Sequence, residues 1–197
     1  MRGQVSTDLP LTIVVCIRMN KVLLLSGTCG SGKTTLSKLV AKRWNWERIC
    51  EDDIWPELFG KDRGDPRLPD GKRKRAQVHE IVFDKILEYR RHKKNIVIDL
   101  TVHEAPPDAF FEYKEFFEAN GIPFEIRILH PRLEVAISRD SRRTCWSVGP
   151  ERVKRLREKY TKESFGAENF IDNSDESPEG TLEKHFRDLL NSDSMST

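Results

Sequence analysis

Cysteine is scarce in this sequence of 197 residues, and its spacing forms no metal-binding pattern. The four cysteines stand at positions 16, 29, 50 and 145, and no two of them make a C-x-x-C pair. This spacing argues against a zinc site. It favours reduced thiols, which are typical of a cytoplasmic protein.

An excess of charge of one sign is also missing. The 34 basic residues nearly balance the 32 acidic ones and leave a net charge of +2, whereas a general nucleic-acid binder carries a strong basic excess. Apolar residues make up 37% of the chain, which is too large a share for a disordered protein. A chain of 197 residues is long enough for one α/β domain with a real core.

The amino-terminal apolar run is not long enough to cross a membrane. It covers residues 11–17, directly after Pro10. A signal peptide is disfavoured because Arg2 is the only early positive charge and no A-x-A-like cleavage site follows. We expect residues 1–18 to be an appended segment, as an extra strand, a disordered arm or the product of an over-extended gene model. Residues 19–190 are then the domain, and residues 191–197 a disordered tail.

What the sequence does contain is one well-defined motif near its amino end. Residues 27–34 read Gly-Thr-Cys-Gly-Ser-Gly-Lys-Thr and fit the pattern G-x-x-x-x-G-K-[ST]. The apolar run at residues 22–25 stands directly before it, and Leu36, Leu39 and Val40 follow at helical spacing. Strand, glycine-rich turn and helix are the context that the motif requires, which disfavours a chance glycine-rich turn.

The residue types of the motif suit the binding of a polyphosphate. Glycines at positions 27, 30 and 32 allow positive φ angles, so the backbone amides can approach phosphate oxygens. The start of the following helix adds the positive end of its dipole. We expect Lys33 to reach the β and γ phosphates and the hydroxyl of Thr34 to ligate Mg²⁺. The motif resembles the Walker A loop of the P-loop NTPases, which implies a nucleoside triphosphate, most often ATP. The nucleotide-binding residues would then be Gly27, Thr28, Cys29, Gly30, Ser31, Gly32, Lys33, Thr34 and Thr35.

Two carboxylates follow the next predicted strand, which lies at about residues 48–50. Asp52 and Asp53 would stand at its carboxyl end, where ligands gather in open α/β sheets. A carboxylate there is placed to accept the proton of an acceptor hydroxyl. The alternative is that one of them only caps a helix that begins near Ile54.

A third carboxylate, Asp99, ends an apolar strand predicted at residues 95–101. An aspartate beside a P-loop strand often holds the Mg²⁺ shell, directly or through water. The alternative is a carboxylate that is only hydrogen-bonded by nearby backbone amides. His103 and Glu104 follow on a loop from which they could contact the acceptor.

Arginines gather on a helix predicted at residues 131–143. Arg139 and Arg143 lie four residues apart and therefore share one face. Guanidinium groups stabilise the charge of a transferring phosphoryl group and stack on adenine. The alternative is ion pairing with Glu134 or Asp140. The loop at residues 144–149 then reads as a lid over the phosphates.

Helices and strands alternate through the rest of the chain. Further helices are predicted at residues 72–92, 107–120, 151–160 and 177–190, and a further strand at residues 123–129. Residues 169–174 are typical of a last strand and its exit loop. The first of these helices begins with the basic block Lys72–Arg75, which is either a solvated face or a contact for an anionic substrate. The pattern predicts a three-layer α/β P-loop NTPase fold with a mostly parallel five-stranded sheet.

The order of these parts resembles the small P-loop kinases of the nucleoside-monophosphate-kinase-like group. The likeness covers about residues 19–190 and is greatest to the branch, of AAA family ATPase type, that includes chloramphenicol phosphotransferase, zeta toxin and the kinase domain of polynucleotide kinase. It implies that Asp52 acts as the acceptor-side carboxylate, that Arg139 and Arg143 are lid arginines and that Asn173 lies near adenine. Trp55 stands where this branch often has an arginine, which argues against a phosphorylated or polynucleotide acceptor.

The resemblance and the motifs together predict an ATP-dependent kinase. We expect it to move the γ-phosphoryl group of ATP to a hydroxyl of a small molecule with Mg²⁺, in the cytoplasm, as a monomer or homodimer and without membrane contact. Lys33, Asp52, Arg139 and Arg143 are the predicted catalytic residues, and Thr34 and Asp99 the predicted metal ligands. A polynucleotide 5′-hydroxyl kinase and a non-catalytic ATP-binding or ATPase switch are the alternatives. The sequence lacks the N-K-x-D of GTPases, the L-S-G-G-Q of transporter ATPases and the G-x-G-x-x-G of dinucleotide-binding folds.

Overall fold

The computed structural model describes residues 20–60, 62, 68–101, 108–144 and 147–191. The expectations for residues 1–18, for His103 and Glu104 and for residues 192–197 therefore lie outside the described residues. None of the helices in the described ranges is long and apolar enough to cross a membrane.

A five-stranded sheet forms the centre of the molecule. Its strand order is β2-β3-β1-β4-β5, and every neighbouring pair is parallel. The prediction of a five-stranded, mostly parallel sheet is confirmed, and the parallel arrangement is complete. The strands are β1 (Val22–Gly27), β2 (Glu47–Cys50), β3 (Ile96–Leu100), β4 (Phe124–Leu129) and β5 (Phe170–Ile171).

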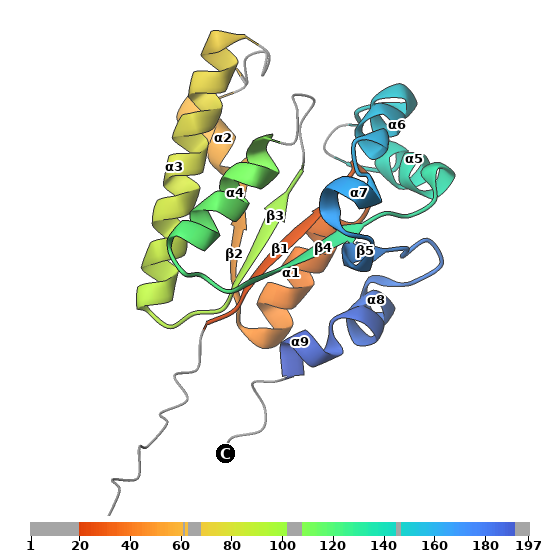
Figure 1. Cartoon of the computed structure of the whole chain (residues 1–197). Coiled ribbons are helices and arrows are strands. Elements are labelled where there is room, and N and C mark those ends of the chain that lie inside the picture. The colour runs from red at the N-terminus through yellow and green to blue at the C-terminus, as the bar shows by residue number, and fades with distance from the viewer. Residues whose placement is uncertain (1–19, 61, 63–67, 102–107, 145–146, 192–197) are drawn as a thin grey trace, which may run out of the picture.

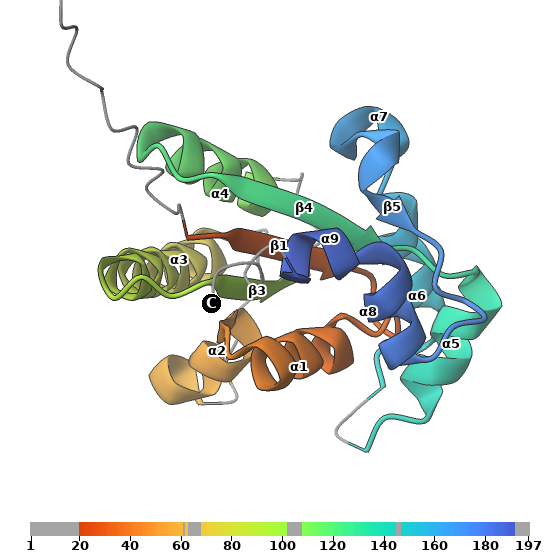
Figure 2. The same ribbon diagram turned by 90° about the horizontal axis from the view of Figure 1, so that it is seen from below.

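Helices cover both faces of the sheet (Figures 1 and 2). One face packs against α1 (Lys33–Trp44), α8 (Pro178–His185) and α9 (Arg187–Asn191), and the other against α3 (Pro69–Arg91) and α4 (Asp108–Ala119). Every residue of β1 and β3 is buried, as expected of parallel strands covered on both sides. Successive side chains of β1 therefore enter opposite clusters, Leu23 and Leu25 one, Val22 and Leu24 the other.

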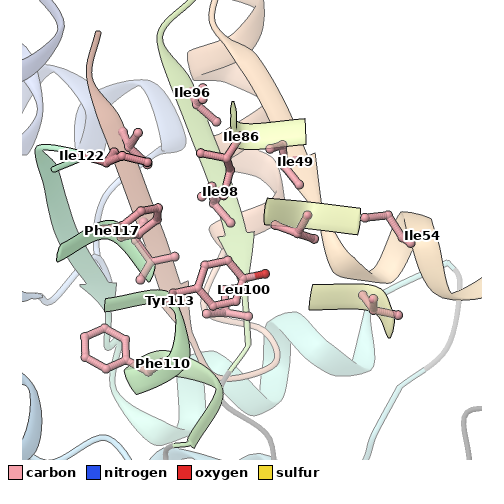
Figure 3. Close-up of a cluster of buried hydrophobic side chains, with 14 of the residues drawn as sticks. Ile49, Ile54, Ile86, Ile96, Ile98, Leu100, Phe110, Tyr113, Phe117 and Ile122 are labelled. Carbon is pink, nitrogen blue, oxygen red and sulfur yellow. The ribbon is translucent and has the colours of Figure 1, made fainter. Parts of the chain in front are cut away.

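The cluster under α3 and α4 is the larger of the two. It contains an aromatic face of α4, with Phe110, Tyr113 and Phe117 against Ile98 and Leu100 of β3 (Figure 3). Tyr113 and Phe117 are both fully buried. The aromatic face of this helix is therefore part of the core.

A separate group of helices lies beyond the carboxyl ends of β1 and β4 (Figure 1). It consists of α5 (Leu133–Ser141) and α6 (Pro150–Glu158), followed by the short α7 (Lys162–Phe165) and a 3₁₀ turn at Ala167–Asn169 that leads into β5. These helices stand over the end of the sheet at which the glycine-rich loop lies.

Two element boundaries differ from those predicted. Helix α2 (Glu51–Phe59) begins three residues before Ile54, because three consecutive acids suit a helix amino terminus. Helix α5 ends at Ser141, so Arg143 lies outside it. The last strand has only two residues and is followed by a loop, which agrees with the strand and exit loop predicted for residues 169–174.

Candidate functional site

The glycine-rich loop joins β1 to α1 and packs closely on a neighbouring helix. Gly30 has a φ of 75°, and a Cβ atom placed on it would lie 2.0 Å from the carbonyl oxygen of Ala136 in α5. Only glycine fits this position. Gly32 has a φ of 97° and directly precedes α1. The amino-terminal amides of α1 lack partners within the helix, so the loop ends in a set of donors suited to an anion.

Three hydrogen bonds hold the backbone of the glycine-rich loop in place. The amide of Ser31 donates to the carbonyl of Thr28 at 3.1 Å. The hydroxyl of Thr28 donates to the carbonyl of Val153 in α6 at 3.2 Å. The side-chain amide of Asn173 donates to the carbonyl of Ser31 at 3.0 Å. The loop is thereby tied both to α6 and to the segment after β5.

Lys33 is a buried cation surrounded by negative charge. Lys33 is only 7% exposed. Burial acts to lower the pKa of Lys33, but nearby negative charge, first that of Asp99 and also that of Asp52, outweighs burial and raises the pKa above its ordinary value. Lys33 therefore stays charged at neutral pH. The two carboxylates predicted at the strand ends lie within electrostatic reach of the loop lysine.

Asp99 is buried and held by side chains rather than by backbone amides. Its Oδ2 accepts hydrogen bonds from the hydroxyl of Ser37 in α1 at 3.2 Å and from Arg48 of β2 at 3.0 Å. The charge partner of Asp99 is therefore Arg48, and not the backbone amides that were considered as the alternative. The hydroxyl of Ser37 also donates to the carbonyl of Thr34 at 3.1 Å, so Thr34 and Asp99 share one neighbour.

Oxygen donors near the phosphate loop fit a magnesium ion. Thr34 offers a hydroxyl and Asp99 a carboxylate, and Mg²⁺ is usually bound through one or two such groups, water and substrate phosphates. The residues that the structure describes contain no cluster of three or more His, Cys, Asp or Glu suited to a metal. A magnesium ion that binds together with a nucleotide does not need such a cluster, because phosphate oxygens and water supply its other ligands.

Asp52 and Asp53, the two acids predicted near the site, have different contacts. Asp53 forms an ion pair with Arg48 at 2.6 Å. Asp52 is exposed in the first turn of the helix. The residue that caps α2 is Cys50, so the alternative that Asp52 or Asp53 only caps this helix is excluded. Burial raises the pKa of the Cys50 thiol to about 12, which leaves this cysteine protonated and unreactive.

A cavity of about 240 Å³ opens beside the phosphate loop. The loop and α1 line one side of it, and arginines and the segment after β5 line the other. Two acceptor atoms of that segment, Oδ1 of Asn173 and Oε2 of Glu176, are buried without a hydrogen-bond partner. The lining residues are Gly30, Gly32, Lys33, Thr34, Thr35, Leu36, Arg139, Arg143, Asn173, Glu176 and Pro178.

The two predicted lid arginines both line this cavity, although only one is helical. Arg139 donates to the carbonyls of Asn173 at 3.0 Å and Ser174 at 3.2 Å, and so joins α5 to the segment after β5. Arg143 lies 3.4 Å from Asp140, which is one of the ion pairs weighed as an alternative. Glu134, the other alternative partner, pairs with Arg132.

The residues of the basic block at the start of α3 differ in their exposure to solvent. Arg73 is exposed and pairs with Asp70, as expected of a solvated face. Lys74 pairs with Asp62 and Asp70, but its side chain is only 11% exposed. Arg75 is 8% exposed and therefore lies inward.

Sequence reasoning missed three residues that shape the site. Arg48 bridges Asp53 and Asp99, and Glu176 lines the cavity. Glu51 is buried at the end of β2 beside the exposed Asp52. The role of Arg48 depends on the pairing of β2 with β3, which the sequence alone did not show. No sequence signal distinguished Glu51 from its two acidic neighbours.

A parallel sheet, a glycine-rich loop that opens into α1 and a charged, buried lysine define a P-loop nucleotide-binding domain. The chain belongs to the AAA domain family, whose model matches residues 22–165. No curated protein sequence matches the chain.

Solved structures share this fold at low sequence identity. Shikimate kinase from Bacteroides thetaiotaomicron is 20% identical and superposes with a TM-score of 0.62, over 86% of this chain and 98% of that one. The tunicamycin resistance protein of Deinococcus radiodurans is 12% identical with a TM-score of 0.62, over 88% and 95% of the two chains. A chain of the Pnkp1/Rnl/Hen1 RNA repair complex is 21% identical with a TM-score of 0.58.

The last of these structures is much longer. The match covers 75% of this chain but only 46% of the RNA repair chain. The family and the solved structures confirm the P-loop fold that was expected from the sequence.

Proposed function

We propose that the protein transfers the γ-phosphoryl group of ATP to a hydroxyl of a small molecule. The observation that carries the proposal is the buried, charged Lys33 with Asp52 and Asp99 within reach of it. A site that only binds nucleotide needs the lysine, but it has no use for an exposed carboxylate at the carboxyl end of the neighbouring strand. Kinases with this fold, such as shikimate kinase, support the assignment.

Each group has a role in an in-line displacement. Lys33 offsets the charge on the β and γ phosphates, and Arg139 and Arg143 stabilise the charge of the phosphoryl group in transfer. A magnesium ion held by Thr34 and Asp99 would add further charge neutralisation. The acceptor oxygen forms a bond to the γ phosphorus while the bond to the β–γ bridging oxygen breaks. Asp52 orients the acceptor hydroxyl and accepts its proton, and ADP leaves.

A small acceptor is favoured over a polynucleotide by the residue at position 55. Trp55 is 6% exposed and packs against Phe59, with ring centroids 5.4 Å apart. The position at which related kinases often carry an arginine is therefore filled by a core side chain, which cannot pair with a phosphate on the acceptor. We propose in addition that the protein acts in the cytoplasm, as a monomer or homodimer.

The likeness to the RNA repair chain keeps one alternative open, a polynucleotide 5′-hydroxyl kinase. A panel of sugars, antibiotics, nucleosides and 5′-hydroxyl oligonucleotides, incubated with γ-labelled ATP, separates the two. We expect label on a small molecule and none on the oligonucleotides. Asp52→Asn should keep the affinity for ATP and lose about 10²-fold or more in transfer rate. Unaltered transfer by this variant would remove the proposed role of Asp52.

A further inference from the structure

A buried carboxylate stands directly beside the proposed catalytic one. Glu51 is the first residue of α2 and is 4% exposed, whereas the next residue, Asp52, is exposed. Burying a carboxylate is costly unless hydrogen-bond or charge partners compensate for the lost water. The partners of Glu51 therefore show what this position is built to do.

Two side chains from two different helices hold Glu51. The hydroxyl of Tyr113 in α4 donates to Oε1 of Glu51 at 2.8 Å. Nε2 of His79 in α3 lies 3.2 Å from the same oxygen, at ion-pair distance but outside hydrogen-bond geometry. His79 is 2% exposed and also contacts Glu112 of α4 through Nδ1. The first turn of α2 is thus fastened to both helices that cover this face of the sheet.

The aromatic core fixes the two partners in turn. The ring of Tyr113 packs edge-on against His79 at 5.4 Å and against Phe83 at 5.2 Å between centroids. Figure 3 shows Tyr113 inside the buried cluster, with its hydroxyl pointing away from Phe110 and Phe117. Neither side chain can turn without disturbing the core.

The residue that follows Asp52 is anchored as well. Asp53 pairs with Arg48, and Arg48 pairs with Asp99 at the end of β3. The acids before and after Asp52 are therefore both anchored, one into the core and one to the neighbouring strand ends. These two anchors restrain the backbone of α2 at the position of Asp52.

We infer that Glu51, held by His79 and Tyr113, is a positioning residue that sets the direction of Asp52 toward the acceptor. This inference rests on the proposed function, because Asp52 has a direction to keep only if it serves an acceptor. A misplacement of about 1 Å in a catalytic group can lower a rate by up to about 10²-fold without touching the reacting atoms.

Tyr113→Phe tests the inference with the smallest change. It removes only the hydroxyl that donates to Glu51 and keeps the ring in the core. We expect roughly a tenfold fall in kcat for transfer from γ-labelled ATP, to water or to the best hydroxyl compound of the panel, with the Kd for ATP unchanged. Phe124→Leu is the matched control. Phe124 packs in the same core cluster against Phe117, with ring centroids 4.8 Å apart, and not against the two partners of Glu51. The variant should lower the melting temperature while kcat stays within twofold.

A double-mutant cycle separates positioning from a structural role. In the Asp52→Asn background, Tyr113→Phe should cause no further fall in kcat, because the residue through which it acts is already changed. Hydrogen exchange should be faster in residues 50–59 of Tyr113→Phe and unchanged in the glycine-rich loop. Equal falls in both backgrounds, or an unchanged kcat in Tyr113→Phe, would overturn the inference.

The cycle also distinguishes this inference from the proposed function. If Asp52→Asn alone leaves transfer unchanged, or if the wild-type protein transfers no label, the proposed function fails, and positioning of Asp52 fails with it. If Asp52→Asn lowers transfer and Tyr113→Phe does not, the positioning role fails while the proposed function stands.

Discussion

At the scale of single residues, one glycine decides whether the phosphate loop can form. Gly30 combines a positive φ with a close approach to the carbonyl of Ala136. Gly121 also has a positive φ, of 58°, but nothing lies within 4 Å of the place where its Cβ would be. The two positions therefore separate the cost of the backbone angle from the cost of the close contact.

We predict that Gly30→Ala destabilises the protein more than Gly121→Ala. The alanine at position 121 should cost about 1–2 kcal/mol for the left-handed backbone. The alanine at position 30 adds the clash with α5 and should lower the free energy of unfolding by at least about 3 kcal/mol, or displace α5 and weaken ATP binding. Urea denaturation of both variants measures the difference, and equal losses would contradict the prediction.

A second residue-scale prediction concerns His79 and pH. Burial acts to lower the pKa of His79, but Glu51 and Glu112 outweigh it and raise the pKa above its usual 6.5. Tyr113 also faces the ring, and Arg75 lies one helical turn earlier on α3. The stability that the charged imidazole contributes is fully present below about pH 6.5, the unfolded value, and is lost as the pH rises through the folded value.

Denaturation of the wild type and of His79→Gln at several pH values tests this. The wild type should be more stable than the variant at pH 6, and the difference should shrink as the pH is raised above 7. A difference in unfolding free energy that grows with pH would contradict the assignment of a raised pKa.

At the scale of elements, Asp140 joins α5 to α6. The carboxylate is 1% exposed, and its Oδ2 accepts from the hydroxyl of Ser147 at 2.7 Å and from the amide of Val148 at 2.9 Å. Because α6 in turn holds Thr28 of the phosphate loop through the carbonyl of Val153, the connection reaches the site itself. The lid predicted at residues 144–149 is thus tied at its carboxyl end.

We predict that Asp140→Asn raises the KM for ATP by about tenfold. The amide has no charge and only one acceptor oxygen, for which Arg143 and the donors of residues 147 and 148 then compete. The start of α6 therefore loosens, and the phosphate loop that α6 contacts is held less firmly. Ser147→Ala removes only one of these hydrogen bonds and should raise the KM by less. Steady-state kinetics with both variants give the comparison. A larger effect from Ser147→Ala would show that Asp140 is not the anchor.

The elements that follow from local pattern were predicted well, and those set by tertiary contact were not. The apolar runs of β1 and β3 and the glycine-rich motif identified the centre of the sheet, since buried parallel strands have little choice of composition. A helix was expected to begin near Ile54, but α2 begins at Glu51, where contacts with His79 and Tyr113 add to the local effect of the three acids. Partners that lie 28 and 62 residues away in the sequence leave no local signal.

In the site, too, the residues of local motifs were found from the sequence, and a residue that depends on tertiary contacts was missed. Lys33, Arg139, Arg143 and Asn173 line one cavity, as the motif and the resemblance led us to expect. Arg48 was missed because its role depends on the register of β2 and β3, which pairs Cys50 with Asp99. Register is fixed by packing of both faces and cannot be read from a four-residue strand.

At the scale of the whole molecule, the groups proposed for catalysis lie at the carboxyl ends of the parallel strands.

The amino-terminal limit of the domain can also be tested. The described core begins at Val22, and the backbone amide of Lys21 donates to Oδ1 of Asn95 at 2.9 Å. We predict that a variant that begins at Met19 has the melting temperature and the ATP affinity of the full chain. Calorimetry and thermal denaturation test this, and a lower melting temperature would show that residues 1–18 belong to the domain.

The central claim is that the loop around Lys33 holds a nucleoside triphosphate, and titration calorimetry of ATP with Mg²⁺ tests it most directly. The wild type should bind with micromolar to millimolar affinity. Lys33→Ala should show no measurable heat of binding while circular dichroism and thermal denaturation report an intact fold. Equal binding by a folded Lys33→Ala variant would contradict the account.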